Sequence, residues 1–290
     1  MTFDGKLKHS IELLQKYEKL AMLYSDKGYY LAFSGGKDSQ ALYHIAKLAG
    51  VRFEAHYNVT TIDPPELVRF IRKQYPDVVF NHPKLSFAKL CINKKMLPTR
   101  YTRFCCAELK ETGGGGTVTL TGVRHAESSR RKFRGEAEIF SRNEKRRFQG
   151  TSTNFDQFTR NKEVENVQCI KGKDKIIINP IIEWSEDDVW EFLNNVVKVQ
   201  HCELYDKGRT RLGCLFCPMA NIKSIRKDCE EYPKYKALII RTINTLRSNG
   251  YMSNYTDLTD EEVFEWWISK KSIKQWYCDN ELQLKLFNEL

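Results

Sequence analysis

The sequence has no apolar run close to the roughly 18 residues that a helix needs to cross a bilayer. It therefore predicts no transmembrane segment and no membrane partner. Residues Met1 to Ser10 are polar and charged, and they lack the apolar core of a signal peptide. The chain also contains no internal repeat. From these absences we expect a cytoplasmic protein.

The chain does contain the composition of an ordinary globular protein, 41% hydrophobic and 29% charged. Its 290 residues allow one large α/β domain, or one domain with a small appendage. The net charge of +10 suits an anionic partner. That partner is either a nucleotide or a longer nucleic acid, and the charge does not choose between them.

Short apolar runs alternate with amphipathic stretches along much of the chain. The runs predict strands at 29–33, 53–57, 78–80, 117–123 and 176–178. Helical spacing predicts helices at 6–24, at 40–49, from 64–65 onward and after a cap at Ser185. This alternation predicts an α/β fold, a Rossmann-like parallel twisted sheet with helices on both faces.

Two parts of the chain depart from that alternation. Residues 124–175 are polar and rich in arginine, so we expect a basic loop or a small insertion there. The tail from about Pro218 has a mostly helical pattern. We therefore expect a nucleotide-binding α/β domain over residues 1–217 and a helical C-terminal extension over residues 218–290.

A glycine-rich loop lies between the first of these strands and the helix after it. It consists of Ser34, Gly35, Gly36, Lys37, Asp38 and Ser39. The glycines let the backbone approach phosphates, and the helix N-terminus offers unpaired N–H groups. Lys37 adds a positive charge, the serines add hydroxyl donors, and Asp38 adds a carboxylate that can help to hold Mg²⁺. A plain tight turn is the alternative interpretation.

The loop is not a Walker motif, which needs glycine where Leu31 stands and serine or threonine where Asp38 stands. It resembles the pyrophosphatase loop (PP-loop) of the adenine nucleotide α-hydrolase superfamily. That resemblance implies attack on the α-phosphate of ATP, adenylation of a substrate and release of pyrophosphate.

Within that superfamily, two later segments resemble the phosphoadenosine phosphosulfate reductase family. They are the Gly-x-Arg-x-x-x-Ser stretch that begins at Gly122 and the segment 180–190. The similarity extends over residues 28–220. It implies that Gly122, Arg124 and Arg131 line the phosphates of a nucleotide or substrate. A solvated arginine is the alternative for Arg124.

Four of the nine cysteines form two close pairs, Cys105–Cys106 and Cys214–Cys217. A disulfide scaffold is not expected in a cytosolic chain of this length. Four thiolates suit tetrahedral zinc or a [4Fe–4S] cluster. The pattern resembles the cluster sites of adenylylsulfate reductases and of the sulfur-transfer proteins of DNA phosphorothioation, as does the stretch 205–218. The resemblance implies a [4Fe–4S] cluster, and zinc or free thiols remain the alternatives.

Two other cysteines bear on the reaction. Cys202 is either a sulfur-carrying thiol or a buried one. Reductases of this family use a C-terminal cysteine within Glu-Cys-Gly-x-His, whereas the last cysteine here, Cys278, lies between Tyr277 and Asp279. Their nucleotide loop also tends to lose the lysine, and Lys37 is present. Both departures favour ATP over a sulfonucleotide.

We therefore predict an ATP pyrophosphatase, with Lys37 and Asp38 as catalytic residues, that adenylates an acceptor for iron–sulfur-assisted sulfur transfer. Basic and aromatic residues interleaved between Arg124 and Phe148 suit the phosphate backbone of DNA or tRNA, or else form a solvated loop. A cysteine desulfurase is a candidate sulfur donor. The alternatives are a sulfonucleotide reductase, or another enzyme of sulfur assimilation, and a non-catalytic regulatory protein that senses nucleotides.

Overall fold

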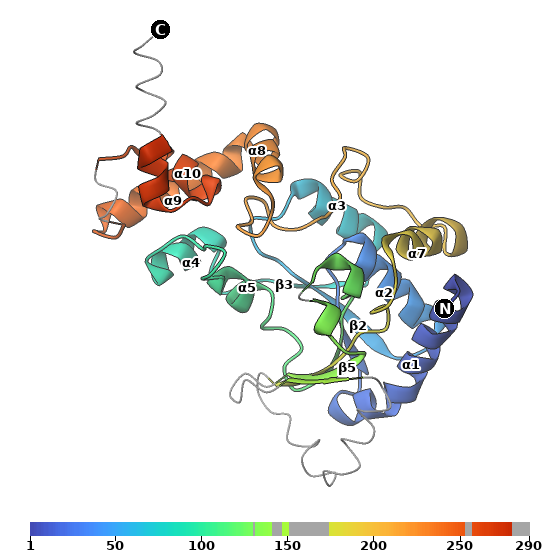
Figure 1. Ribbon diagram of the computed structural model, residues 1–290. Helices are drawn as coiled ribbons and strands as arrows, with labels where there is room; N and C mark the ends of the chain where they lie inside the picture. Colours follow the sequence, from blue (N-terminus) through green and yellow to red (C-terminus); the bar gives the residue numbers. More distant parts are fainter. Residues whose placement is uncertain (130, 141–146, 151–173, 253–256, 280–290) are drawn as a thin grey trace. The chain divides into compact units, whose positions relative to one another are not determined.

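The computed structural model describes the chain except residues 130, 141–146, 151–173, 253–256 and 280–290 (Figure 1). The chain divides into two compact units, each built from segments that are separate in the sequence. The first, here called the sheet unit, comprises Met1–Val59, Pro65–His82 and Lys110–Gly213. The second, the helical unit, comprises Thr60–Pro64, Pro83–Leu109 and Cys214–Leu290.

A seven-stranded sheet forms the centre of the sheet unit, in the order β3-β2-β1-β4-β7-β5-β6. Its strands are β1 (Tyr29–Ala32), β2 (Phe53–Asn58), β3 (Val79–Asn81), β4 (Val118–Leu120), β5 (Ala137–Phe140), β6 (Arg147–Gly150) and β7 (Lys175–Ile178). The run from β3 to β7 is parallel, and β5 is antiparallel to both of its neighbours. The α/β class expected from the sequence is confirmed.

The strand order reverses at β1. The chain moves outward from β1 through β2 to β3 and then returns to β4, on the other side of β1. In open parallel sheets, ligands bind beyond the carboxyl ends of the strands at such a reversal. The loop that follows β1 lies at this place in the topology.

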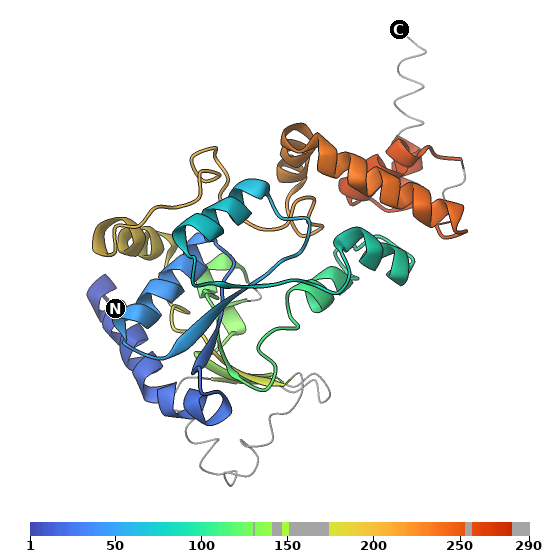
Figure 2. The same ribbon diagram turned by 180° about the vertical axis from the view of Figure 1, so that it is seen from behind.

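The helices of the sheet unit overlap the predicted ones, although the first two begin earlier than predicted. They are α1 (Phe3–Tyr24), α2 (Lys37–Leu48), α3 (Pro65–Gln74) and α7 (Glu186–Glu191), which continues into the π-helical turn η4 (Phe192–Val196). The Ser185 hydroxyl accepts a hydrogen bond from the Asp188 N–H at 3.0 Å and so caps α7. Helices α1 and α2 pack against each other (Figure 2). The Tyr29 hydroxyl ties α1 to β1, because it donates to the Leu14 carbonyl at 2.7 Å.

The expectation of a loop over residues 124–175 is wrong for part of that stretch. It contains two short 3₁₀ turns, η1 (His125–Glu127) and η2 (Arg131–Phe133), and the strands β5 and β6. Ala137 of β5 is fully buried beside β7. Pairing with distant strands satisfies the backbone groups of this polar segment. Residues 141–146 and 151–173, with much of the predicted basic stretch, lie outside the described residues.

The helical unit has a hydrophobic core of its own. Its helices are α4 (Phe87–Lys94), α5 (Phe104–Leu109), α8 (Ile222–Glu231), α9 (Pro233–Ser248) and α10 (Asp260–Ser269). Phe216, Ile239 and Phe264 are among the most buried members of this core. No helix in the described part of the chain is long and apolar enough to cross a membrane.

The helical unit includes more of the chain than its C-terminal tail. Segments 60–64 and 83–109 belong to it, and its last segment begins at Cys214. The core explains the first two segments, because Ile62, Leu90 and Leu109 pack in it with residues of the tail. The domain boundary expected after residue 217 lies close to Cys214, where the last segment of the helical unit begins. That boundary stays a prediction.

Candidate functional site

The loop between β1 and α2 has a backbone that only glycine accommodates at one position. Gly35 has a φ of +72°, and a Cβ there would lie 2.7 Å from side-chain atoms of Leu67 and of Ile71. Such a φ favours glycine, and such a contact would force the side chains of Leu67 and Ile71 to move. The next residue, Gly36, caps α2 without a side-chain hydrogen bond. The start of α2 therefore presents bare backbone at the carboxyl edge of the sheet.

The two serines of the loop hold its shape. The Ser34 N–H donates to the Ser39 hydroxyl oxygen at 3.1 Å, and that hydroxyl donates to the Gly36 carbonyl at 2.9 Å. Ser39 is buried, and its oxygen also lies 3.2 Å from the Ser34 hydroxyl oxygen. These bonds close the turn across the two glycines. Ser39 thus acts as a structural element of the loop, in addition to any contact with a ligand.

Lys37 places a buried ammonium group beside the loop. The residue is only 5% exposed. Its Nζ lies 3.3 Å from a carboxylate oxygen of Glu186, 3.2 Å from the Thr210 carbonyl oxygen and 4.0 Å from an Asp38 oxygen. The ammonium is held by oxygen atoms, the kind of partner that a phosphate would also supply.

Asp38 is paired with Arg124, a contact that the sequence did not predict. The Arg124 Nε lies 2.7 Å from an Asp38 oxygen, and the arginine side chain is 4% exposed. Gly122 permits this approach, because a Cβ there would lie 3.0 Å from the backbone of Asp38. Gly122 and Arg124 therefore lie against the start of α2.

Arg131 is connected to Arg124 through the carboxylate of Glu127. It forms an ion pair with Glu127, whose carboxylate also accepts the Arg124 N–H at 3.1 Å. Among the described residues, Arg131 forms its ion pair with this carboxylate and not with a loop residue. A direct role of Arg131 at the phosphates stays a prediction.

Tyr205 is a loop neighbour that the motifs did not single out by itself. Its hydroxyl oxygen accepts a hydrogen bond from the Lys37 backbone N–H at 2.9 Å. Its ring centroid lies 5.8 Å from the Lys37 Nζ and 5.1 Å from the ring centroid of Trp190. Burial raises the pKa of this phenol above its usual value, so the hydroxyl stays protonated. Glu186 and Thr210 were missed as well, since only the folded chain brings them to Lys37.

The four paired cysteines all belong to the helical unit. Cys105 and Cys106 lie on α5, and Cys214 and Cys217 lie in the turns before α8. None of the four forms a disulfide, and all four are half-buried. The pKa of the Cys105 thiol is raised by a hydrogen bond with Cys106, by burial, and by the nearby thiols of Cys214 and Cys217. The two pairs thus lie within electrostatic reach of one another.

The donor set fits a four-thiolate group in number and kind. Among the described residues, however, no group of three or more histidine, cysteine or acidic side chains is placed to hold a metal ion. The assignment of a cluster to these cysteines therefore stays a prediction. Cys202 is fully buried in the sheet unit, and burial raises the pKa of its thiol. Because the thiolate is the nucleophile, this favours the interpretation of Cys202 as a packing residue.

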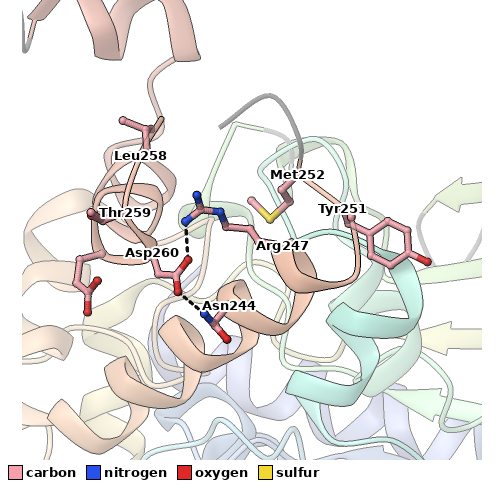
Figure 3. Close-up of a pocket in the computed structure, with 9 residues that line it drawn as sticks. Asn244, Arg247, Tyr251, Met252, Leu258, Thr259 and Asp260 are labelled. Atoms are coloured by element: carbon pink, nitrogen blue, oxygen red, sulfur yellow. Dashed lines mark hydrogen bonds and ion pairs between the residues drawn. The ribbon is translucent and has the colours of Figure 1, made fainter. Parts of the chain in front are cut away.

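The helical unit contains a pocket of about 690 Å³ (Figure 3). It lies where α9 ends and α10 begins. Asp260 joins the two helices, because it accepts hydrogen bonds from Arg247 at 2.6 Å and from Asn244 at 2.8 Å. We interpret this arrangement as a structural joint.

Comparison with curated proteins gives relatives that are longer than this chain. An uncharacterized protein of Methanocaldococcus jannaschii is 25% identical over 250 residues, which cover 84% of this chain and 53% of the relative. A second uncharacterized protein of that organism is 33% identical over 104 residues, covering 36% of this chain and 19% of the relative. The chain thus spans about half the length of the first of these relatives, and less of the second.

Similar solved structures include an FMN adenylyltransferase of Candida glabrata in complex with ATP, with a TM-score of 0.45 and 14% identity. The match covers 73% of this chain and 61% of that one. A phosphoadenylyl-sulfate reductase of Candida auris has a TM-score of 0.43 and 17% identity, covering 73% of this chain and 93% of that one. The model of the phosphoadenosine phosphosulfate reductase domain matches residues 28–220, well over half of the sequence. The chain belongs to the phosphoadenosine phosphosulfate reductase domain family.

Proposed function

We propose that this chain is an ATP pyrophosphatase, which transfers the AMP of ATP to an acceptor and so prepares that acceptor for sulfur. The observation that carries the proposal is the buried ammonium of Lys37 at the start of α2. ATP has a β,γ-pyrophosphate that this charge can neutralise, whereas a sulfonucleotide has none. The position of the loop at the reversal of the strand order supports the same ligand.

In the proposed reaction an acceptor oxygen attacks the α-phosphorus of ATP. The bond between that phosphorus and the oxygen bridging to the β-phosphate breaks, and its electron pair leaves with pyrophosphate. The first N–H groups of α2, Lys37 and Mg²⁺ stabilise the charge on this leaving group. Asp38 is the loop carboxylate available to Mg²⁺, and its pairing with Arg124 fixes its direction. A sulfur nucleophile then displaces AMP from the adenylated acceptor.

Cys105, Cys106, Cys214 and Cys217 are the residues that would hold an iron–sulfur cluster. Their position in one unit and their mutual electrostatic influence support this part of the proposal. When bound, such a cluster supplies iron at which the sulfur to be delivered can be coordinated. Zinc is the alternative occupant of the same four thiols.

DNA or tRNA is the acceptor that we favour, and a cysteine desulfurase is a candidate sulfur donor. The net charge of +10 supports an anionic acceptor of this kind. Sulfonucleotide reduction is the second candidate, because the chain belongs to a family named for that reaction. The lack of a Glu-Cys-Gly-x-His stretch around Cys278 argues against it.

Two parallel incubations, together with a measurement of nucleotide binding, separate these three functions. Mg²⁺-ATP with DNA or tRNA should give AMP and pyrophosphate in the presence of the protein. Phosphoadenosine phosphosulfate with a thiol reductant should give no sulfite. Sulfite release would support the reductase, and nucleotide binding without any turnover would support a sensing protein.

A further inference from the structure

A short segment of the sheet unit lies directly on the phosphate loop. It runs from Tyr205 to Thr210 and is here called the strap. Two of its atoms accept hydrogen bonds from one loop residue, Lys37. The Tyr205 hydroxyl accepts the backbone N–H at 2.9 Å, and the Thr210 carbonyl accepts the Nζ at 3.2 Å.

The strap is folded tightly on itself. The Tyr205 N–H donates to the Cys202 carbonyl at 3.0 Å, and the Tyr205 carbonyl accepts the Gly208 N–H at 2.9 Å. Cys202 and Leu204 just before it are almost fully buried. These contacts hold the backbone at Tyr205 in place, and thus position its hydroxyl beside Lys37.

The Lys37 N–H that donates to this hydroxyl is a group to which an anion can bind. The first N–H groups of an α-helix have no partner within the helix, and a phosphate oxygen commonly takes them. Lys37 is the first residue of α2. A Cβ on Gly36 would lie 3.5 Å from the Tyr205 hydroxyl oxygen, so the phenol stands over the bare backbone of the loop.

The Lys37 side chain is occupied in the same way. Its ammonium contacts a carbonyl oxygen of the strap and a carboxylate oxygen of Glu186, at 3.2 Å and 3.3 Å. A pyrophosphate group that binds at the loop needs both the N–H and the ammonium of this residue. The strap therefore supplies oxygen atoms to both groups that the ligand would use.

We propose that Tyr205 is a placeholder, whose hydroxyl must give up the Lys37 N–H before a pyrophosphate group can bind. The inference rests on the proposed function of the loop. The strap competes with a ligand that takes these two groups of Lys37, so it lowers the affinity of the loop for pyrophosphate. AMP has no pyrophosphate group and does not need the Lys37 N–H, so the strap does not compete with it.

Tyr205→Phe tests the inference, because it removes the hydroxyl and keeps the ring that packs on Trp190. Loss of one competing neutral hydrogen bond should raise the affinity for pyrophosphate with Mg²⁺ by about fivefold in calorimetric titration. Affinity for AMP should stay unchanged. The matched control is Tyr29→Phe, which removes another buried phenol hydroxyl of the sheet unit and should alter neither affinity.

An unchanged or weaker affinity of Tyr205→Phe for pyrophosphate would overturn the inference. An equal gain for pyrophosphate and AMP would also overturn it, since that would indicate general loosening. A second measurement needs no variant: the amide proton resonance of Lys37 should shift when pyrophosphate saturates the wild-type protein. Binding of pyrophosphate without that shift would refute the displacement and leave the proposed function standing. No binding of pyrophosphate or ATP by the wild-type protein would refute the proposed function itself.

Discussion

Replacement of Lys37 by methionine separates the chemical role of this residue from its structural one. Methionine fills most of the space of the buried stem and removes the ammonium. The stability should change little, because the partner Glu186 is 57% exposed and water can solvate its carboxylate. An ion pair with so exposed a partner contributes at most about 1 kcal/mol. We expect the free energy of unfolding in urea to fall by about 1 kcal/mol or less.

The effect on the reaction should be far larger. The ammonium is buried beside the loop, where a charge directed at a leaving group contributes about 3–4 kcal/mol to transition-state stabilisation. Turnover of ATP to AMP and pyrophosphate should therefore fall roughly 10²–10³-fold. Quantification of pyrophosphate in a coupled phosphate assay provides the measurement.

Lys47→Met is the matched control for Lys37→Met, because Lys47 lies on the same helix with a side chain that is 53% exposed. It should leave turnover at the wild-type value. If Lys37→Met also turns over ATP within threefold of wild type, the assignment of the loop is refuted.

Three further predictions concern the loop, a buried histidine and the cysteines. Gly35→Ala should lower both pyrophosphate affinity and the melting temperature, because its Cβ would lie 2.7 Å from α3 side chains at a φ of +72°; an unaltered melting curve would contradict this. Burial lowers the pKa of His44 to about 4. The unfolded chain binds this proton near pH 6.5, so stability is complete above that pH and falls as the pH drops toward 4, by about 3 kcal/mol. His44→Gln should flatten that part of the stability profile, and an unchanged profile would exclude His44 as its source. Protein purified without oxygen should be brown, with absorption near ~400 nm; Cys105→Ser should reduce the iron content and the exposed Cys278→Ser should not, whereas stoichiometric zinc in a colourless protein would refute the cluster.

The local pattern of the sequence predicted most of the sheet unit. The strand before the loop, the helix after it and the cap at Ser185 depend on residues close together in the chain, and the structure has all three. Strands β5 and β6 were not predicted, because each has only four residues within a largely polar stretch and both are held by pairing, β5 with β7 and β6 with β5. The place of segments 60–64 and 83–109 in the helical unit was not predicted either, because their packing partners lie far along the chain.

The candidate site, too, could be predicted from the sequence only in part. The family resemblance predicted that Gly122 and Arg124 line the phosphates of a ligand, which stays a prediction; the structure places both against Asp38. Tyr205 and Thr210 lie far from Lys37 in the sequence, and no spacing rule connects them to it. Contacts of this kind follow from the whole fold, so the sequence indicated the glycine-rich loop and not the groups that contact Lys37.

The most direct test of the account is the stoichiometry of the products from Mg²⁺-ATP in the presence of DNA or tRNA. The proposed reaction breaks the bond between the α- and β-phosphates, so AMP and pyrophosphate should appear in equal amounts as ATP disappears, or adenylated acceptor should replace AMP before sulfur arrives. Ion-exchange chromatography separates these products. Formation of ADP and phosphate, or no consumption of ATP with any acceptor, would contradict the central claim.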